Sequence, residues 1–175
     1  MKVLVTGGVR SGKSRHAEEL LAGYDGVTYV APGPTAEEDT DPDWALRLAA
    51  HQERRPAGWT TLETRDLPLA LGSDGPVLVD CLGTWLTGLL DSAAAWEEPA
   101  AVVHEVVGER LEAAVAALQA AEGPVVLVTN EVGLGVVPAH RSGRLFRDLL
   151  GTVNQRLAGE CDEVHLVIAG RVLRL

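Results

Sequence analysis

This 175-residue chain is poor in cysteine and in long apolar runs, and each shortage excludes a class of protein. Its two cysteines, Cys81 and Cys161, lie far apart and have no paired His or Cys neighbours. Neither a disulfide framework nor a zinc site is indicated, and a reducing cytoplasm fits this usage. No apolar run approaches the roughly 20 residues that cross a bilayer, and the N-terminus does not resemble a signal peptide. We therefore expect a soluble protein without a membrane anchor.

Positive charge is scarce as well. The chain has 25 acidic and 15 basic residues, for a formal net charge of −10. A field of this sign repels nucleic acids and anionic membranes, so neither is expected as a partner, and local arginines must supply any anion site. The length suffices for one domain with a full core but not for two ordinary ones, which predicts a single domain over residues 1–175.

Arginine stands at nearly every basic position, and the only lysines are Lys2 and Lys13. Lys13 lies in VLVTGGVRSGKS, which matches G-x-x-x-x-G-K-S from Gly7 and is the spacing of a P-loop between a strand and a helix. In a P-loop, glycines let successive N–H groups point at phosphate oxygens, the lysine reaches the outer phosphates, and a hydroxyl, here that of Ser14, can bind Mg²⁺. The alternative, a glycine turn with an incidental lysine, is disfavoured by the flanking strand and helix.

Short apolar runs alternate with helical stretches along the chain, and several runs are nearly continuous in Val and Leu, as in strands buried on both faces. This alternation predicts an α/β fold with a mostly parallel sheet flanked by helices. Gly170 should turn the chain into a short antiparallel strand at the C-terminal edge. The segment 32–42, rich in Pro, Gly and acids, should be an exposed loop. The expected strands are 2–6, 27–31, 76–80, 124–129, 163–169 and 171–175, and the expected helices 13–22, 44–53, 82–92, 99–121 and 141–158.

Polar residues follow two of the expected strands. Asp80 ends the run VLVD in the way that a Walker B acid is presented to Mg²⁺ beside a P-loop. It could also serve as the N-cap of the helix that begins at Leu82. Asn130 and Glu131 should face the crevice beyond the carboxyl ends of the parallel strands. They could contact nucleotide or acceptor there, or equally cap the next turn.

Of the five histidines, His51 has the neighbours that best suit a chemical role. It lies near the end of an expected helix and is followed by Arg54 and Arg55 before Pro56 stops that helix. A neutral imidazole can attack phosphorus without an auxiliary base, while guanidiniums take up charge on phosphoryl oxygens. A solvated His–Arg helix end is the commoner alternative. Packing alone explains the histidines at 16, 104 and 165.

Arg141, Arg144 and Arg147 stand three residues apart and share roughly one helical face. Such a stripe could hold a phosphate. For any single arginine, a solvated position with Asp148 as local partner is the more common arrangement.

Taken together, the motifs resemble one family, the bifunctional adenosylcobinamide kinase/adenosylcobinamide-phosphate guanylyltransferases of cobalamin assembly. The P-loop alone indicates only a superfamily, whereas its arginine-serine version combined with H-x-x-x-R-P and T-N-E-V-G is quite specific. The resemblance spans almost the whole chain, through VTGGVRSGKSRHAE, RLAAHQERRPAGW, VLVDCLGTWLTGLL, VVLVTNEVGLGVVP and HRSGRLFRDLLGTVNQRLA.

The resemblance implies a RecA-like P-loop domain that phosphorylates adenosylcobinamide and then transfers GMP from GTP to adenosylcobinamide phosphate. ATP and GTP are the implied substrates, Mg²⁺ the implied cofactor, and a homotrimer with the histidine segment near a subunit boundary the implied assembly. GMP passes through a phosphoramidate on the histidine that matches His51. The implied catalytic residues are His51 and Lys13, and the implied metal ligands Ser14 and Asp80. The implied nucleotide contacts are Gly7, Gly8, Val9, Arg10, Ser11, Gly12, Lys13, Ser14, Ala31, Pro32, Gly33, Gln52, Glu53, Arg54, Arg55, Glu63 and Asp80.

Three places depart from the family pattern. Ala50 stands where the family often has a second histidine or a polar residue, and Gly88 stands where Asn is expected. The loop before Trp44 matches poorly, so Pro32 and Gly33 are the least supported contacts. Two other functions stay open from the sequence. One is a P-loop kinase of another small alcohol in which His51 is structural, and the other is a GTP-regulated binding module.

Overall fold

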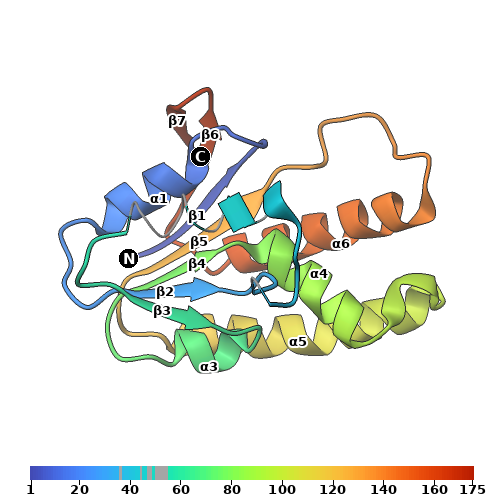
Figure 1. Cartoon of the computed structure of the whole chain (residues 1–175), viewed down its shortest axis with the longest axis horizontal. Coiled ribbons are helices and arrows are strands. Elements are labelled where there is room, and N and C mark those ends of the chain that lie inside the picture. The colour runs from blue at the N-terminus through green and yellow to red at the C-terminus, as the bar shows by residue number, and fades with distance from the viewer. Residues whose placement is uncertain (36, 44, 47–48, 50–54) are drawn as a thin grey trace.

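The computed structural model describes residues 1–35, 37–43, 45–46, 49 and 55–175. Within them, seven strands form one sheet in the order β3-β2-β4-β5-β1-β6-β7 (Figure 1). All neighbouring pairs from β1 to β6 are parallel, and β7 pairs antiparallel with β6. The predicted α/β architecture with an antiparallel C-terminal edge is confirmed. The strands are β1 (Lys2–Gly7), β2 (Thr28–Ala31), β3 (Thr60–Glu63), β4 (Val77–Asp80), β5 (Val125–Asn130), β6 (Glu163–Ile168) and β7 (Arg171–Arg174).

Helices cover both faces of the sheet, and side chains that alternate along the strands divide the core between them (Figure 1). Along β1, Val3 and Val5 pack in the layer of α1, whereas Leu4 packs in the layer of the other helices. None of the helices in the described residues is both long and apolar enough to span a membrane. The helices are α1 (Lys13–Leu21), α3 (Leu67–Leu71), α4 (Leu82–Ser92), α5 (Ala100–Ala120) and α6 (Arg141–Ala158), with a 3₁₀ turn η1 (Ala95–Glu97).

Two elements, β3 and α3, were not expected from the sequence. β3 is an edge strand whose residues are mostly exposed, so it has no continuous apolar run to mark it. α3 has only five residues, and it begins where Asp66 Oδ1 accepts a hydrogen bond from Leu69 N at 3.1 Å. The helix expected over 44–53 falls largely outside the described residues.

Gly88, which departs from the family pattern, lies against the side chain of Arg65. A Cβ at Gly88 would stand 2.6 Å from Arg65 Nε, so this arginine occupies the space that a larger residue would need. Arg65 Nη2 donates a hydrogen bond to Glu38 Oε2 at 2.7 Å. The hydrogen bond that Glu38 accepts from Thr35 N, and after it the one from Arg65, lowers the pKa of the Glu38 carboxyl. The arginine thereby connects α4 to the segment 32–42. The prediction of an exposed loop holds for the described residues after Thr35, which are largely exposed, but not for Pro32, which is buried, or for residues 33–35, which are half-buried.

His16 and His165 join α1 to the sheet. His16 Nε2 lies 2.9 Å from His165 Nδ1, and His165 Nε2 lies 2.8 Å from Glu163 Oε2. His165 is 1% exposed, and burial followed by the neighbouring His165 lowers the pKa of His16. The two histidines thus connect α1, the helix that follows the P-loop, to β6 through a hydrogen bond, whereas the sequence analysis expected only packing contacts.

Candidate active site

The P-loop forms where the sequence predicts it, between β1 and α1. Arg10 and Gly12 adopt left-handed backbone conformations, with φ of 57° and 96°, and Gly12 is the N-cap of α1. Ser11 N donates to Gly8 O at 3.3 Å, which closes the loop on itself. Lys13 Nζ donates to Gly8 O at 3.2 Å, so the ammonium group lies along the loop. The arrangement directs the positive end of α1 and one fixed cation toward the same space.

Gly7 is required by close packing. A Cβ at this position would stand 2.4 Å from the main-chain oxygen of Val167 and 2.7 Å from Ser11 Oγ. By contrast, a Cβ at Gly8 would meet nothing within 4 Å among the described residues. The two adjacent glycines therefore have different structural roles.

We expect Gly7→Ala to lower the free energy of unfolding by about 1–3 kcal/mol, because the Val167 carbonyl belongs to β6 and cannot move without disturbing the sheet. Gly8→Ala, the matched control, should change it by less than about 0.5 kcal/mol. Thermal unfolding followed by circular dichroism measures both. Equal melting temperatures for the two variants would show that the close approach of β6 is not what selects glycine at position 7.

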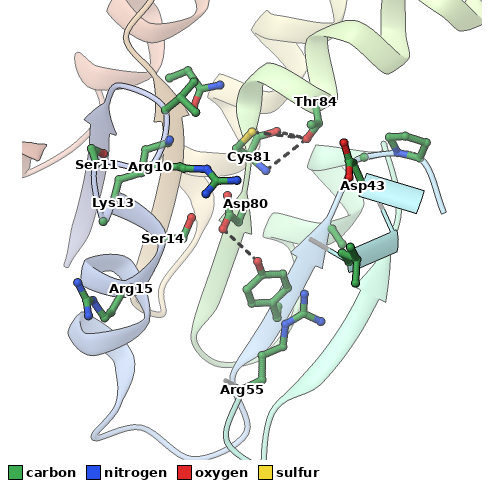
Figure 2. A pocket seen from close by; sticks show the side chains of 18 of the residues that line it. Arg10, Ser11, Lys13, Ser14, Arg15, Asp43, Arg55, Asp80, Cys81 and Thr84 are labelled. Atoms are coloured by element: carbon green, nitrogen blue, oxygen red, sulfur yellow. Dashed lines mark hydrogen bonds between the residues drawn. The ribbon is translucent and has the colours of Figure 1, made fainter. Parts of the chain in front are cut away.

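A cleft of about 810 Å³ opens beside the P-loop at the carboxyl ends of β2, β3, β4 and β5 (Figure 2). This is the edge at which open parallel sheets bind ligands. Asp43 and Leu46 also line it. Eleven of the residues predicted to bind nucleotide or metal line this cleft: Val9, Arg10, Ser11, Gly12, Lys13, Ser14, Ala31, Gly33, Arg55, Glu63 and Asp80.

Other predicted site residues lie elsewhere. Gly7 and Gly8 belong to the P-loop backbone but are not among the described residues that line the cleft, and neither is Pro32, which is buried. The remaining four predicted site residues, His51, Gln52, Glu53 and Arg54, lie outside the described residues.

Asp80 does not cap α4. The N-cap is Cys81, whose backbone N–H donates to Thr84 Oγ1 at 3.4 Å, while Thr84 Oγ1 donates to Cys81 O at 2.9 Å. Burial, and after it the charge of Asp80, raises the pKa of the Cys81 thiol. The alternative in which Asp80 acts as the cap is therefore wrong, and its carboxylate lines the cleft instead (Figure 2).

Tyr29 is a residue of the site that sequence reasoning missed. Its hydroxyl donates to Asp80 Oδ2 at 3.1 Å, and the guanidinium carbon of Arg55 stands 3.5 Å from the centroid of its ring. Burial, and then the charge of Asp80, raises the pKa of Tyr29, so its hydroxyl stays protonated. The apolar run around Tyr29 indicates a strand but contains no signal for either partner.

Ser14 and Asp80 could together hold a magnesium ion. Figure 2 shows both side chains projecting into the same space between α1 and β4. Mg²⁺ in phosphate-binding enzymes takes one or two protein oxygens and fills its other positions with phosphates and water. Among the described residues, no group of three or more His, Cys, Asp and Glu side chains could hold a metal ion by itself. The donor set thus fits an ion that arrives with a nucleotide.

Asn130 and Glu131, for which two roles were open, have different positions. Asn130 lines the cleft, and its main-chain oxygen accepts a hydrogen bond from Asn154 Nδ2 at 3.2 Å. Glu131 accepts a hydrogen bond from Gly133 N through Oε1, so it caps the following turn. Asn130 is consequently the one placed to contact a ligand.

The three arginines of α6 bind main-chain oxygens. Arg141 donates to Trp96 O and Glu98 O, and Arg144 donates to Pro138 O at 3.0 Å and Ala139 O at 2.6 Å. Arg147 donates to Gly135 O at 2.9 Å and also to Gly133 O. Arg144 and Arg147 thus fix the connection between β5 and α6, whereas Arg141 joins α6 to the segment between α4 and α5. Neither sequence interpretation anticipated these roles.

Comparison with known proteins gives a consistent result. Residues 3–175 match the family described as cobinamide kinase / cobinamide phosphate guanyltransferase. The chain is 41% identical over 179 aligned positions to the bifunctional adenosylcobalamin biosynthesis protein CobU of Salmonella typhimurium, with 97% of each chain covered. It is 37% identical to the protein of the same name from Escherichia coli, again with 97% of each covered. It is 40% identical to CobP of Pseudomonas aeruginosa, with 97% of this chain and 94% of that protein covered.

Proposed function

Because the chain belongs to the cobinamide kinase / cobinamide phosphate guanyltransferase family, we propose that its cleft serves two successive reactions of adenosylcobalamin biosynthesis. In the first, a phosphoryl group passes from ATP or GTP to the hydroxyl of the aminopropanol arm of adenosylcobinamide. In the second, GMP passes from GTP to adenosylcobinamide phosphate, and adenosylcobinamide-GDP is formed. Both reactions need a triphosphate held at one place, which is what a P-loop provides.

In this proposal the P-loop and the ends of the strands hold the nucleotide. The backbone N–H groups around Gly12 and the ammonium group of Lys13 bind the outer phosphates, because the positive end of α1 and the lysine charge face the cleft. Ser14 and Asp80 would hold Mg²⁺, which when bound withdraws charge from the phosphate oxygens. Arg55 neutralises charge that develops on the phosphoryl group in transit.

His51 is the proposed nucleophile of the second reaction. A ring nitrogen attacks the α-phosphorus of GTP, an N–P bond forms, and the bond to the β-phosphate breaks with release of pyrophosphate. A phosphate oxygen of adenosylcobinamide phosphate then attacks the same phosphorus and breaks the N–P bond. Each step exchanges one bond to phosphorus for another, so the histidine is regenerated.

The observation that carries this assignment is that Leu46 and Arg55 both line the cleft. His51 stands five residues after the first and four before the second. Four residues of fully extended chain span at most about 14 Å, so the chain length from Arg55 permits His51 to reach a nucleotide in the cleft.

The test is to incubate the protein with GTP and Mg²⁺ and to measure its intact mass. We expect the mass of one GMP to be added, in a linkage that is labile to acid and stable to base, and we expect no adduct with ATP. An unmodified protein that still consumes ATP with adenosylcobinamide would contradict the covalent route and leave a kinase. A protein that binds nucleotide without any turnover would be a binding module instead.

We further propose that the single domain of residues 1–175 works as a homotrimer in the cytoplasm. The family resemblance implies the trimer, and the scarcity of cysteine fits the compartment. Sedimentation equilibrium that gives the mass of one chain would contradict the trimer.

A further inference from the structure

Tyr29 connects the carboxylate and the guanidinium on one wall of the cleft, and neither reaction assigns it a role. We propose that Tyr29 is a positioning residue for the metal–nucleotide complex: its hydroxyl orients Asp80, and its ring holds Arg55 against the phosphates. The inference rests on the proposed function, in that the cleft must hold a nucleotide together with a divalent cation. It assigns one task to the hydroxyl of Tyr29, which orients Asp80, and a separate task to the ring, which supports Arg55.

The sheet places Tyr29 within reach of Asp80. β2 and β4 are parallel neighbours in which Tyr29 is paired with Leu78, and both of these side chains belong to the core layer shared with α1. Asp80 follows Leu78 by two residues and therefore points to the same face of the sheet. The hydroxyl of Tyr29 donates to Asp80 Oδ2 at 3.1 Å, which fixes the orientation of the carboxylate. Since Tyr29 is only 2% exposed, its ring has little freedom to turn away.

The same ring supports Arg55. The guanidinium carbon stands 3.5 Å from the ring centroid, a cation–π contact, and Arg55 Nη1 donates to Thr61 Oγ1 at 2.7 Å. The Nε–H group is buried and finds no acceptor among the described residues. A guanidinium has five N–H donors, so one held in this way keeps donors for an anionic ligand in the cleft that it lines.

The hydrogen bond from the Tyr29 hydroxyl to Asp80 Oδ2 fixes a carboxylate that would bind the metal. Groups that orient a metal-binding carboxylate commonly change metal affinity about 10- to 100-fold when they are removed. This sets the scale of the effect expected here.

The test uses Tyr29→Phe, which removes the hydroxyl and keeps the ring, and Tyr29→Leu, which removes both. The ligand is a GTP analogue with a methylene group between the α- and β-phosphates, which binds without transferring GMP. Calorimetry measures its affinity once with Mg²⁺ and once with EDTA. We expect Tyr29→Phe to weaken binding about tenfold or more with Mg²⁺ and to leave binding in EDTA unchanged. Tyr29→Leu should weaken binding in both conditions, since Arg55 loses its support.

Tyr24→Phe is the matched control, because Tyr24 is the only other tyrosine and is 42% exposed. It should bind as the wild type does, and circular dichroism shows whether each variant is folded. If a folded Tyr29→Phe protein bound the analogue like the wild type, or lost affinity equally with and without Mg²⁺, the inference would be overturned and the proposed function would stand. If the wild type itself failed to bind the analogue, the proposed function would fail and the inference with it.

Discussion

His51→Ala is expected to accumulate no covalent GMP and to form adenosylcobinamide-GDP at least roughly 10⁴-fold more slowly than the wild type, because the covalent route has lost its nucleophile. Phosphorylation of adenosylcobinamide should continue, since the P-loop, Ser14 and Asp80 are unchanged. Intact mass after exposure to GTP and Mg²⁺ measures the adduct. Chromatography of the corrinoid products measures the two reactions separately.

His104→Ala is the matched control for this substitution. His104 is an exposed residue of α5, which is not among the elements that line the cleft, and its replacement should leave both reactions intact. A GMP adduct that persists in His51→Ala would assign the nucleophile to another residue. Loss of both reactions in His51→Ala, while the protein remains folded, would show that the histidine contributes to binding or to phosphoryl transfer as well.

Lys13→Ala should slow both reactions about 10²- to 10³-fold, which is the usual cost of removing one group that stabilises the charge of a transition state. The ammonium group lies along the P-loop, 3.2 Å from Gly8 O, and it is the only lysine side chain among the described residues that line the cleft. An outer phosphate without it would have to rely on the backbone N–H groups alone. The ratio kcat/KM for adenosylcobinamide phosphorylation and the initial rate of GMP incorporation measure the effect.

Lys2→Ala provides the comparison. Lys2 is the other lysine, and it stands at the opposite end of β1, where its Nζ donates to Gln119 O at 3.0 Å. We expect this variant to retain the wild-type rates in both assays. If Lys13→Ala retained them too, the glycine loop would not be the site at which the triphosphate is held.

The elements of the fold with regular internal patterns were predicted well from the sequence. β1, β4 and β5 are short Val/Leu runs buried on both faces, and α5 and α6 have apolar residues at helical spacing. β3 and α3 were missed because an exposed edge strand and a five-residue helix lack such patterns. Propensity and periodicity report on neighbours along the chain, so they fail where an element is defined by what it packs against.

The parts of the site differ in the same way: the P-loop is encoded in one segment, whereas other contacts depend on which segments the fold brings together. The P-loop was predictable because its chemistry depends on glycines, a lysine and a serine at fixed spacing in one segment. The partner of Asp80 was not, since Tyr29 lies 51 residues earlier and reaches it only because β2 and β4 are neighbours in the sheet. The arginines of α6 were assigned to phosphate or to solvent, whereas Arg141 binds the carbonyl groups of Trp96 and Glu98, 45 and 43 residues earlier, which only the fold brings near.

The sequence by itself determined the α/β class, the P-loop and the family, because each of these depends on residue types at short, regular spacing. Tertiary structure alone decided the order of the strands, and with it which side chains meet at the carboxyl edge of the sheet. The backbone hydrogen bonds that join parallel strands have the same pattern whatever the sequence, and strands buried on both faces all read as Val/Leu runs, so such a strand does not identify its neighbour. The contact between Tyr29 and Asp80, and the support of Arg55 by the same ring, exist only once that order is set.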